Sequence, residues 1–260
     1  MIRLVAIDMD DTLLTDELTI DPRCAAAIAK AREKGVLVTI ATGRMYRSAL
    51  PYAQQLQIDV PLVCYNGAMI RQVSGKLLHH DPVPEDTVAQ LIPFCAERNL
   101  TLQLYVEEEL VVEEINPHVE YYISVANVPA KAVGTLKPAP STKALIVGNE
   151  VDLDTWEPKI QELFGHQLEA TRSKPRYIEM TKKGVSKAVA LRFLAEHYGI
   201  DRREIMAIGD SFNDLEMIKY AGIGVAMANA PQEVKEVADY VTRSNGEAGV
   251  AYALDCFLAC

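Results

Sequence analysis

Three aspartates follow a short apolar run near the start of the chain, in the stretch AIDMDDTLL at residues 6–14. Asp8, Asp10 and Asp11 come directly after residues that predict a buried β-strand. Carboxylates this close repel one another, and burying them is costly unless a cation or hydrogen-bond donors compensate. A turn or a helix cap requires only one of them, so Asp8 and Asp10 together indicate a site that binds a cation.

Alternating strands and helices surround these aspartates. Apolar stretches predict strands at residues 3–7, 36–42 and 61–67, and helical periodicity predicts helices at 21–35 and at 45–57, the latter interrupted by Pro51. Asp21 and Pro22 have the residue types that favour the N-cap and the first position of a helix. Strands joined by helices in this way indicate a Rossmann-like α/β core, a parallel sheet with helices on both faces.

The alternation is interrupted in the middle of the chain. Residues 83–183 predict helices at 84–99 and 153–165, a strand at 141–148, and hairpins at 101–114 and at 166–181, the second turning at Ser173 to Pro175. From Gly184 onward helices and single strands alternate again. We therefore expect a discontinuous core, residues 1–82 and 184–260, into which an α+β domain of residues 83–183 is inserted.

Polar side chains follow several strands of the predicted core. Asp8 and Asp10 end the first strand, Thr42 ends the second, and Asp210 follows the strand at 204–209. Because ligands bind at the carboxyl ends of the strands in an open parallel sheet, these residues are expected at one edge. Carboxylate oxygens without histidine or thiol partners suit magnesium better than zinc. Thr42 taken alone is more often a residue that favours β-structure than a ligand.

Lys187 and Asp214 lie near the starts of two predicted helices. A cation in the first helical turn opposes the helix dipole, so Lys187 indicates a nearby anion unless its side chain extends into solvent. Asp214, in the stretch GDSFND, is favoured by the dipole of the helix that it begins. A purely structural role and a supporting role in the site both stay open for Asp214.

Composition narrows the class of protein. The formal net charge is −10 and the isoelectric point about 5.1, with no basic block, which argues against nucleic acid or a membrane surface as a partner. Five cysteines without a CxxC pair indicate thiols in a reducing compartment, and the N-terminus has no signal-peptide pattern. We therefore expect a cytoplasmic protein, as a monomer or a homodimer.

Four stretches in order resemble the motifs of the haloacid dehalogenase-like phosphatase superfamily. They are DMDDT at 8–12, ATGR at 41–44, Lys187 within KGVSKAVAL, and GDSFND at 209–214. The large insert between the second and third motifs resembles the Cof-type branch, to whose closing segments MANA at 227–230 and NGEAGVAYAL at 245–254 are similar. Asp11 and Ala228 stand where the family often has glycine, and aspartate tolerates the turn conformations that glycine favours.

The resemblance implies a magnesium-dependent phosphatase that forms an aspartyl-phosphate. It implies that Asp8 attacks phosphorus, and that Asp10 protonates the leaving group and then activates water. Mg²⁺ would be held by Asp8, Asp210 and the backbone carbonyl of Asp10, with Asp214 orienting Lys187 or a metal-bound water. The implied phosphate- or substrate-binding residues are Met9 and Gly43 through their N–H groups, and the side chains of Thr42, Arg44, Lys187 and Asn213.

The resemblance also implies that the insert is a mobile cap, a lid that selects the substrate. The implied partner is a small phosphorylated metabolite, with sugar phosphates as the leading class and cofactor phosphates such as pyridoxal phosphate next. Two alternatives stay open. A phosphomutase of the same superfamily would retain Asp8 and Asp10 and hold its product for a second transfer. A non-catalytic, phosphoryl-accepting signalling module would need neither Asp10 as a proton shuttle nor the insert.

Overall fold

A computed structural model describes residues 1–258 of the chain, in two compact units. Unit 1 combines Met1–Leu78 with the chain from Ser186 onward, and unit 2 is His79–Val185. The structure thus assigns residues 79–82 and 184–185 to unit 2, whereas the sequence pattern places them in the core. Contacts explain the difference. Lys182 Nζ donates to Asp81 Oδ1 at 2.5 Å, His80 Nε2 lies 3.0 Å from Thr142 Oγ1, and the N–H of Val185 donates to the carbonyl of Lys182 at 3.1 Å.

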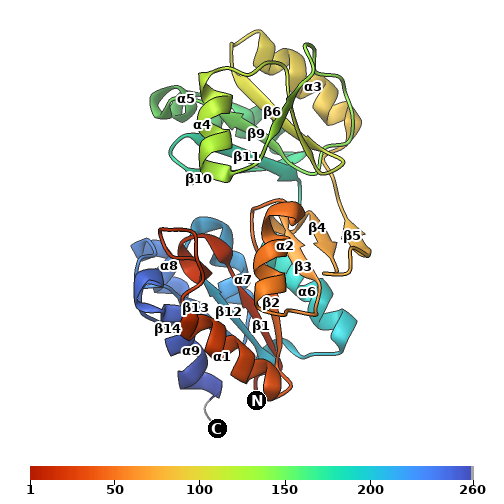
Figure 1. The fold of residues 1–260 in the computed structure, drawn as a ribbon. Coiled ribbons are helices and arrows are strands. Elements are labelled where there is room, and N and C mark those ends of the chain that lie inside the picture. The colour runs from red at the N-terminus through yellow and green to blue at the C-terminus, as the bar shows by residue number, and fades with distance from the viewer. Residues whose placement is uncertain (259–260) are drawn as a thin grey trace. The chain divides into compact units, whose positions relative to one another are not determined.

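The main sheet of unit 1 is parallel throughout, which confirms the predicted core (Figure 1). Its strand order is β14-β13-β12-β1-β2. The strands are β1 (Leu4–Ile7), β2 (Leu37–Ile40), β12 (Ile205–Gly209), β13 (Ile223–Ala226) and β14 (Tyr240–Val241). Strand β1 lies between β12 and β2 and is buried, so the residues that follow it emerge at the middle of the sheet edge.

Helices cover both faces of this sheet. They are α1 (Pro22–Glu33), α2 (Tyr46–Gln55), α6 (Lys187–Tyr198), α7 (Leu215–Tyr220), α8 (Gln232–Val237) and α9 (Gly249–Leu258). Helices α1 and α9 pack together on one face, and α6 and α7 pack on the other (Figure 1). Asp21 caps α1 as expected, accepting a hydrogen bond from the backbone N–H of Arg23 at 2.7 Å.

Helix α2 is continuous, so the expected interruption at Pro51 was wrong. Proline fixes a helical φ angle and here removes only one hydrogen bond, the one to the carbonyl four residues earlier. Burial of Ala49 and Ala53 on either side of Pro51 holds the helix against the core. A small sheet follows, β3 (Leu62–Cys64), β4 (Met69–Arg71) and β5 (Leu77–His80), and a parallel bridge between Ala41 and Val63 links β3 to the end of β2.

Unit 2 is built on a second sheet, of order β10-β11-β9-β6-β7-β8. Its strands are β6 (Thr101–Val106), β7 (Glu109–Val112), β8 (Ala130–Ala132), β9 (Ala144–Val147), β10 (Leu168–Lys174) and β11 (Tyr177–Lys182). The two predicted hairpins are β6–β7 and β10–β11, both antiparallel. Lys174 pairs with Tyr177, so the second hairpin turns at Pro175–Arg176 rather than at Ser173 to Pro175.

Two helices of unit 2 pack on one face of its sheet. Helices α3 (Glu85–Ala96) and α5 (Glu150–Phe164) bury a core with alternate residues of the central strands, among them Leu102, Leu104, Ile146 and Ile178. Helix α4 (Pro117–Ala126) was not predicted from the sequence. Its start signal is present, because Asn116 precedes Pro117 and accepts hydrogen bonds from the N–H groups of His118 and Val119.

Across residues 1–258, none of the helices is both long and apolar enough to cross a membrane. Cys24, Cys64 and Cys95 are buried and Cys256 is exposed. Cys260 lies outside the described residues.

Candidate active site

A tight turn brings the first motif back across the edge of the sheet. After Asp8 the chain turns through Met9–Leu13, and the N–H of Leu14 donates to the carbonyl of Met9 at 2.9 Å. Asp11 has a φ of 56°, the left-handed conformation that aspartate tolerates better than most residues. The turn buries Thr12, whose hydroxyl donates to Asp210 Oδ1 at 2.8 Å. The ends of β1 and β12 are thereby joined.

Lys187 is the first residue of α6, which begins at its N-cap Ser186. Its side chain is fully buried, and its Nζ donates to Asp8 Oδ1 at 2.5 Å and to Asp214 Oδ1 at 2.6 Å. The helix dipole disfavours a cation at the N-terminus of α6, and the two carboxylates compensate for this cost. The hydrogen bonds also restrict the orientation of the Asp8 carboxylate.

Asp214 is completely buried, and its carboxylate accepts three hydrogen bonds. Besides the bond from Lys187, the backbone N–H groups of Asp210 and Ser211 donate to its Oδ2 at 3.1 and 3.0 Å. A Cβ atom on Gly209 would lie 2.5 Å from the Asp214 Cγ, so glycine is required there. Asp214 therefore positions both Lys187 and the loop that carries Asp210.

Asp8, Asp210 and Asp214 bring carboxylate oxygens within 4.8 Å of one another, and all three residues are buried. Burial, with repulsion from Asp214, raises the pKa of Asp8 well above its usual value and that of Asp210 to about 7. Burial alone would lower the pKa of Lys187, but the charges of Asp214 and Asp8 outweigh it and raise that pKa. Lys187 supplies one positive charge to three carboxylates, so the cluster has an excess of negative charge when all three are ionised.

The chemistry of this cluster fits a divalent cation. Hard carboxylate oxygens, shielded from water and incompletely neutralised, are what Mg²⁺ binds in proteins. Because the Asp214 carboxylate is occupied by three donors, Asp8 and Asp210 are the two members best placed to coordinate a metal. The side chain of Asp10, by contrast, is not among the clustered carboxylates.

Asp10 instead forms a two-point ion pair with Arg44. Arg44 Nη2 lies 2.5 Å from Asp10 Oδ1, and Arg44 Nε lies 2.9 Å from Asp10 Oδ2. The sequence-based expectation gave Arg44 to the substrate, whereas in the structure its guanidinium is bound to Asp10. Thr42 is buried beside this pair, and its hydroxyl accepts a hydrogen bond from the N–H of Arg44 at 3.0 Å.

The remaining predicted residues lie on the segments just described. Met9 is fully buried in the first turn, Gly43 lies between Thr42 and Arg44, and Asn213 precedes Asp214. Asn213 Nδ2 donates to the side-chain oxygen of Asn66 at 3.0 Å. Asn66 was missed by sequence reasoning, which took residues 61–67 only as a strand. Its signal was the Asn-Gly dipeptide, which marks a turn with left-handed residues.

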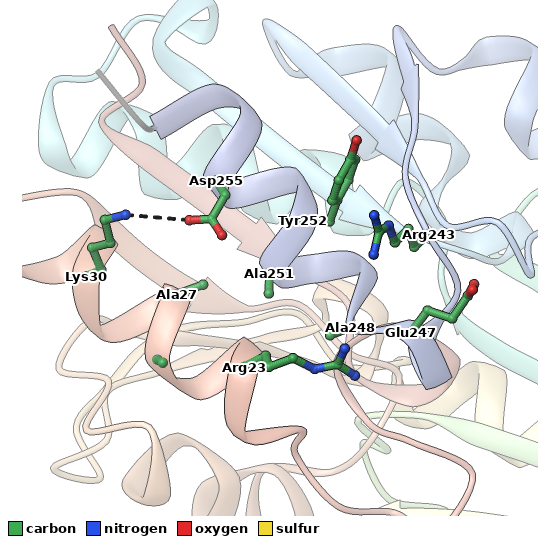
Figure 2. Close-up of a pocket in the computed structure, with 10 residues that line it drawn as sticks. Arg23, Ala27, Lys30, Arg243, Glu247, Ala248, Ala251, Tyr252 and Asp255 are labelled. Carbon is green, nitrogen blue, oxygen red and sulfur yellow. Dashed lines mark ion pairs between the residues drawn. The ribbon is translucent and has the colours of Figure 1, made fainter.

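A groove elsewhere on unit 1 contains none of these residues in its lining. It lies between α1 and α9 and has a volume of about 440 Å³ (Figure 2). Its charged side chains have partners within or beside the groove, since Lys30 lies 3.7 Å from Asp255 and Arg243 lies 4.3 Å from the ring centre of Tyr252. The carboxylate cluster, rather than this groove, is therefore the candidate active site.

Comparison with known proteins places this geometry in a recognised group. Residues 5–254 match the family model described as haloacid dehalogenase-like hydrolase. A Bacillus subtilis protein named 5-amino-6-(5-phospho-D-ribitylamino)uracil phosphatase YitU is 34% identical over 95% of this chain and 94% of its own length. The pyridoxal phosphate phosphatase YbhA of Escherichia coli is 31% identical, and the match covers 96% of each chain.

Solved structures agree with this relationship. A haloacid dehalogenase-like hydrolase from Bacteroides thetaiotaomicron superimposes with a TM-score of 0.90 and 31% identity, covering 98% of this chain and 99% of that one. A sugar phosphatase of subclass IIB superimposes with a TM-score of 0.87 and 25% identity, covering 99% of this chain and 100% of that one. Both matches include the two units.

Proposed function

Since the chain belongs to the haloacid dehalogenase-like hydrolase family and is a phosphoric monoester hydrolase, we propose that it is a magnesium-dependent phosphatase of small soluble phosphomonoesters that works through an aspartyl-phosphate. The observation that carries the proposal is the buried cluster of Asp8, Asp210 and Asp214 around Lys187. Such a cluster is costly to bury, and buried carboxylates with raised pKa values are typical of functional sites.

Asp8 is the nucleophile in this proposal. One of its oxygens bonds to phosphorus while the bond from phosphorus to the leaving oxygen breaks, and the departing alkoxide takes a proton from Asp10. Water then attacks the phosphorus with Asp10 as its base, the bond to Asp8 breaks, and inorganic phosphate leaves. Lys187 holds Asp8 in one orientation throughout, because its ammonium group donates directly to Asp8.

Positive charge is essential because an anion attacks a phosphate dianion. At an effective dielectric constant near 20, two like unit charges about 4 Å apart repel by about 4 kcal/mol. Lys187 supplies one cation, and Asp8, Asp210 and the backbone carbonyl of Asp10 would hold Mg²⁺. When bound, Mg²⁺ supplies Lewis-acid stabilisation of charge on the phosphoryl oxygens. Thr42, Asn213 and the N–H groups of Met9 and Gly43 donate hydrogen bonds to the phosphoryl group in this proposal.

Arg44 has a second role in this proposal besides the expected contact to substrate. Its two-point contact with Asp10 fixes the carboxylate that exchanges protons, and Asp10 keeps 35% of its side chain exposed, so water and a leaving group can reach it. We therefore assign Arg44 to the positioning of Asp10, with direct contact to a substrate as an additional role. Asp214 positions Lys187.

The substrate proposal rests on the relatives. Their names include phosphatases of a ribitylaminouracil phosphate, pyridoxal phosphate and a sugar phosphate. A small metabolite with a phosphorylated polyol or sugar is accordingly our leading class, with cofactor phosphates next. Unit 2 is proposed as the cap that selects among them. We also propose a cytoplasmic protein without nucleic acid or membrane partners.

The test is phosphate release over a panel of sugar and cofactor phosphates with Mg²⁺, for the wild type and for Asp8→Asn. The proposal expects turnover in the wild type and a loss of about 10⁴-fold or more in the variant, because a neutral amide replaces the attacking carboxylate. An isomeric sugar phosphate as product would favour the phosphomutase instead. A stable phosphoprotein without turnover would favour the signalling module. Full activity of Asp8→Asn would refute the assigned nucleophile.

A further inference from the structure

The three residues after strand β3, Tyr65, Asn66 and Gly67, have an unusual backbone. Tyr65 and Asn66 both have positive φ angles, 52° and 57°, in the left-handed region that is unfavourable for residues with a Cβ atom. Gly67 follows with a φ of 105°, and a Cβ atom there would lie 2.3 Å from the backbone oxygen of Ser186. Strained backbone persists where surrounding contacts hold it, and such residues gather at functional sites.

The strained residues hold the loop that carries Thr42. The N–H of Tyr65 donates to the carbonyl of Arg44 at 3.0 Å, and the N–H of Asn66 donates to the carbonyl of Thr42 at 3.0 Å. Two left-handed residues in succession direct consecutive N–H groups at one short loop. The loop of residues 42–44 is thus fixed by the main chain of residues 65–66.

The side chain of Asn66 reaches a second site segment. Asn66 is only 7% exposed, and its Oδ1 accepts the hydrogen bond from Asn213 Nδ2 at 3.0 Å. The same oxygen lies 2.9 Å from the position that a Cβ atom of Gly43 would occupy, so a side chain at residue 43 would displace it. Asn66 therefore contacts both the loop after β2 and the loop after β12.

The bond to Asn66 determines how the Asn213 amide is oriented. An amide nitrogen carries two hydrogens, and Asn66 takes one of them. The Asn213 Oδ1 is buried and has no hydrogen-bond partner among residues 1–258. The link to Asn66 thus fixes which end of the amide is the donor, and it leaves one Nδ2 hydrogen for another acceptor.

We propose that Asn66 is a positioning residue for phosphoryl transfer, which presents the Asn213 amide to an oxygen of the tetrahedral phosphoryl group. The inference rests on the proposed function, because that proposal makes the phosphoryl group the acceptor for Asn213. Asn66 acts through Asn213 by its side chain and through the 42–44 loop by its main chain. A small displacement of the Asn213 amide lowers the reaction rate much more than it lowers the stability of the fold.

Asn66→Gly separates these two roles, since glycine adopts the left-handed φ without strain and lacks the amide. We expect its kcat/KM for para-nitrophenyl phosphate to fall about 10- to 100-fold, as for the loss of a positioned hydrogen bond. Asn99 provides the matched control, because it also has a left-handed φ, 53°, and is exposed on unit 2. Asn99→Gly is expected to retain wild-type kcat/KM, and both variants to retain the wild-type circular dichroism spectrum.

A double-mutant cycle with Asn213→Ala tests whether Asn66 acts through Asn213. On the Asn213→Ala background, Asn66→Gly should lower kcat/KM by less than about threefold, because the amide that it positions is gone. Losses that multiply would contradict the proposed route, and a fully active Asn66→Gly variant would contradict any positioning role.

The affinity of inorganic phosphate, measured by calorimetry with Mg²⁺, tests the inference without turnover. We expect phosphate to bind Asn66→Gly about 5- to 10-fold more weakly than it binds the wild type, as for one weakened hydrogen bond. A wild type that releases no phosphate from any substrate would defeat the proposed function and leave this comparison intact. Equal phosphate affinity in the wild type and in Asn66→Gly would overturn the inference.

Discussion

The two sheets of this protein present polar side chains in different ways. In unit 1 both faces of the parallel sheet are covered by helices, and the polar residues Asp8, Thr42 and Asp210 follow the strand ends. In unit 2 the sheet is antiparallel except where β7 pairs with β8, and it buries alternate apolar residues against α3 and α5. The residues between them, Gln103 and Glu179 among them, belong to the opposite face.

This difference separates two tasks. Residues at the edge of the parallel sheet come from segments far apart in sequence and are fixed by several hydrogen bonds each, which suits the unchanging chemistry of a phosphoryl group. The charged side chains of unit 2 pair within that unit instead. Lys143 is buried, and its Nζ lies 3.2 Å from Glu179 Oε1, so this pair serves the packing of unit 2.

Among variants that keep the nucleophile, removal of the cation from the carboxylate cluster should have the largest effect. We expect Lys187→Met to lower kcat/KM by about 10²- to 10³-fold for every substrate, since an electrostatic group at the reacting atoms is lost. The measurement is the ratio of kcat/KM to wild type over several phosphomonoesters. Lys219→Met, on the neighbouring helix α7, is the control and should retain activity. A loss of kcat/KM for only one substrate would assign Lys187 to substrate selection and would contradict its role in chemistry common to all substrates.

A second effect concerns the buried ion pair of unit 2. Lys143 is 2% exposed and its Nζ lies 3.2 Å from Glu179 Oε1, so Lys143→Met leaves a buried carboxylate without its cation. We expect this variant to lose about 3 kcal/mol in the free energy of unfolding, measured by chemical denaturation. Lys131→Met removes an exposed pair, since Lys131 Nζ lies 2.8 Å from Glu109 Oε2, and should change that free energy by less than about 1 kcal/mol. Unchanged stability of Lys143→Met would contradict a role of this pair in holding unit 2 together.

The smallest effect concerns stability without metal. Burial and Asp214 raise the pKa of Asp210 from 3.8 to about 7, so the folded state holds its proton to higher pH than the unfolded chain. The free energy of unfolding therefore falls as pH rises between these values. Asp210→Asn does not show this decrease, because asparagine does not titrate. In a chelator, chemical denaturation should show Asp210→Asn more stable by about 1 to 3 kcal/mol near pH 8 and equal to wild type near pH 4. If Asp210→Asn were less stable than the wild type near pH 8, the carboxylates of the cluster would not repel one another in the folded state.

Much of unit 1 could be predicted because local signals and the fold agree. The alternation of strands and helices fixes a parallel sheet, and that sheet brings Asp8 and Asp210 to one edge although they are far apart in sequence. Lys187 was detectable because its place in the first helical turn is unfavourable without a partner. Its two carboxylate partners supply what that argument required.

The missed features depend on contacts that periodicity does not encode. Asn66 adopts a left-handed conformation in a turn, and its partner Asn213 lies in another motif. The Arg44–Asp10 pair is likewise a side-chain contact between separate segments. Helix α4 is short and buries mainly Val119 and Tyr122, so its apolar pattern is weak and only the cap at Asn116 marks its start.

The central claim is that Asp8 and Asp210 form a metal site. The binding of Mg²⁺ to the unliganded protein tests this claim most directly. In isothermal titration calorimetry we predict that one Mg²⁺ binds per chain in the wild type and in the control Asp255→Asn, whose residue lies on the exposed side of α9. In Asp210→Asn the affinity should fall at least about 10-fold, since one of two carboxylate ligands is lost. No Mg²⁺ binding to the wild type, or undiminished binding to Asp210→Asn, would contradict the account.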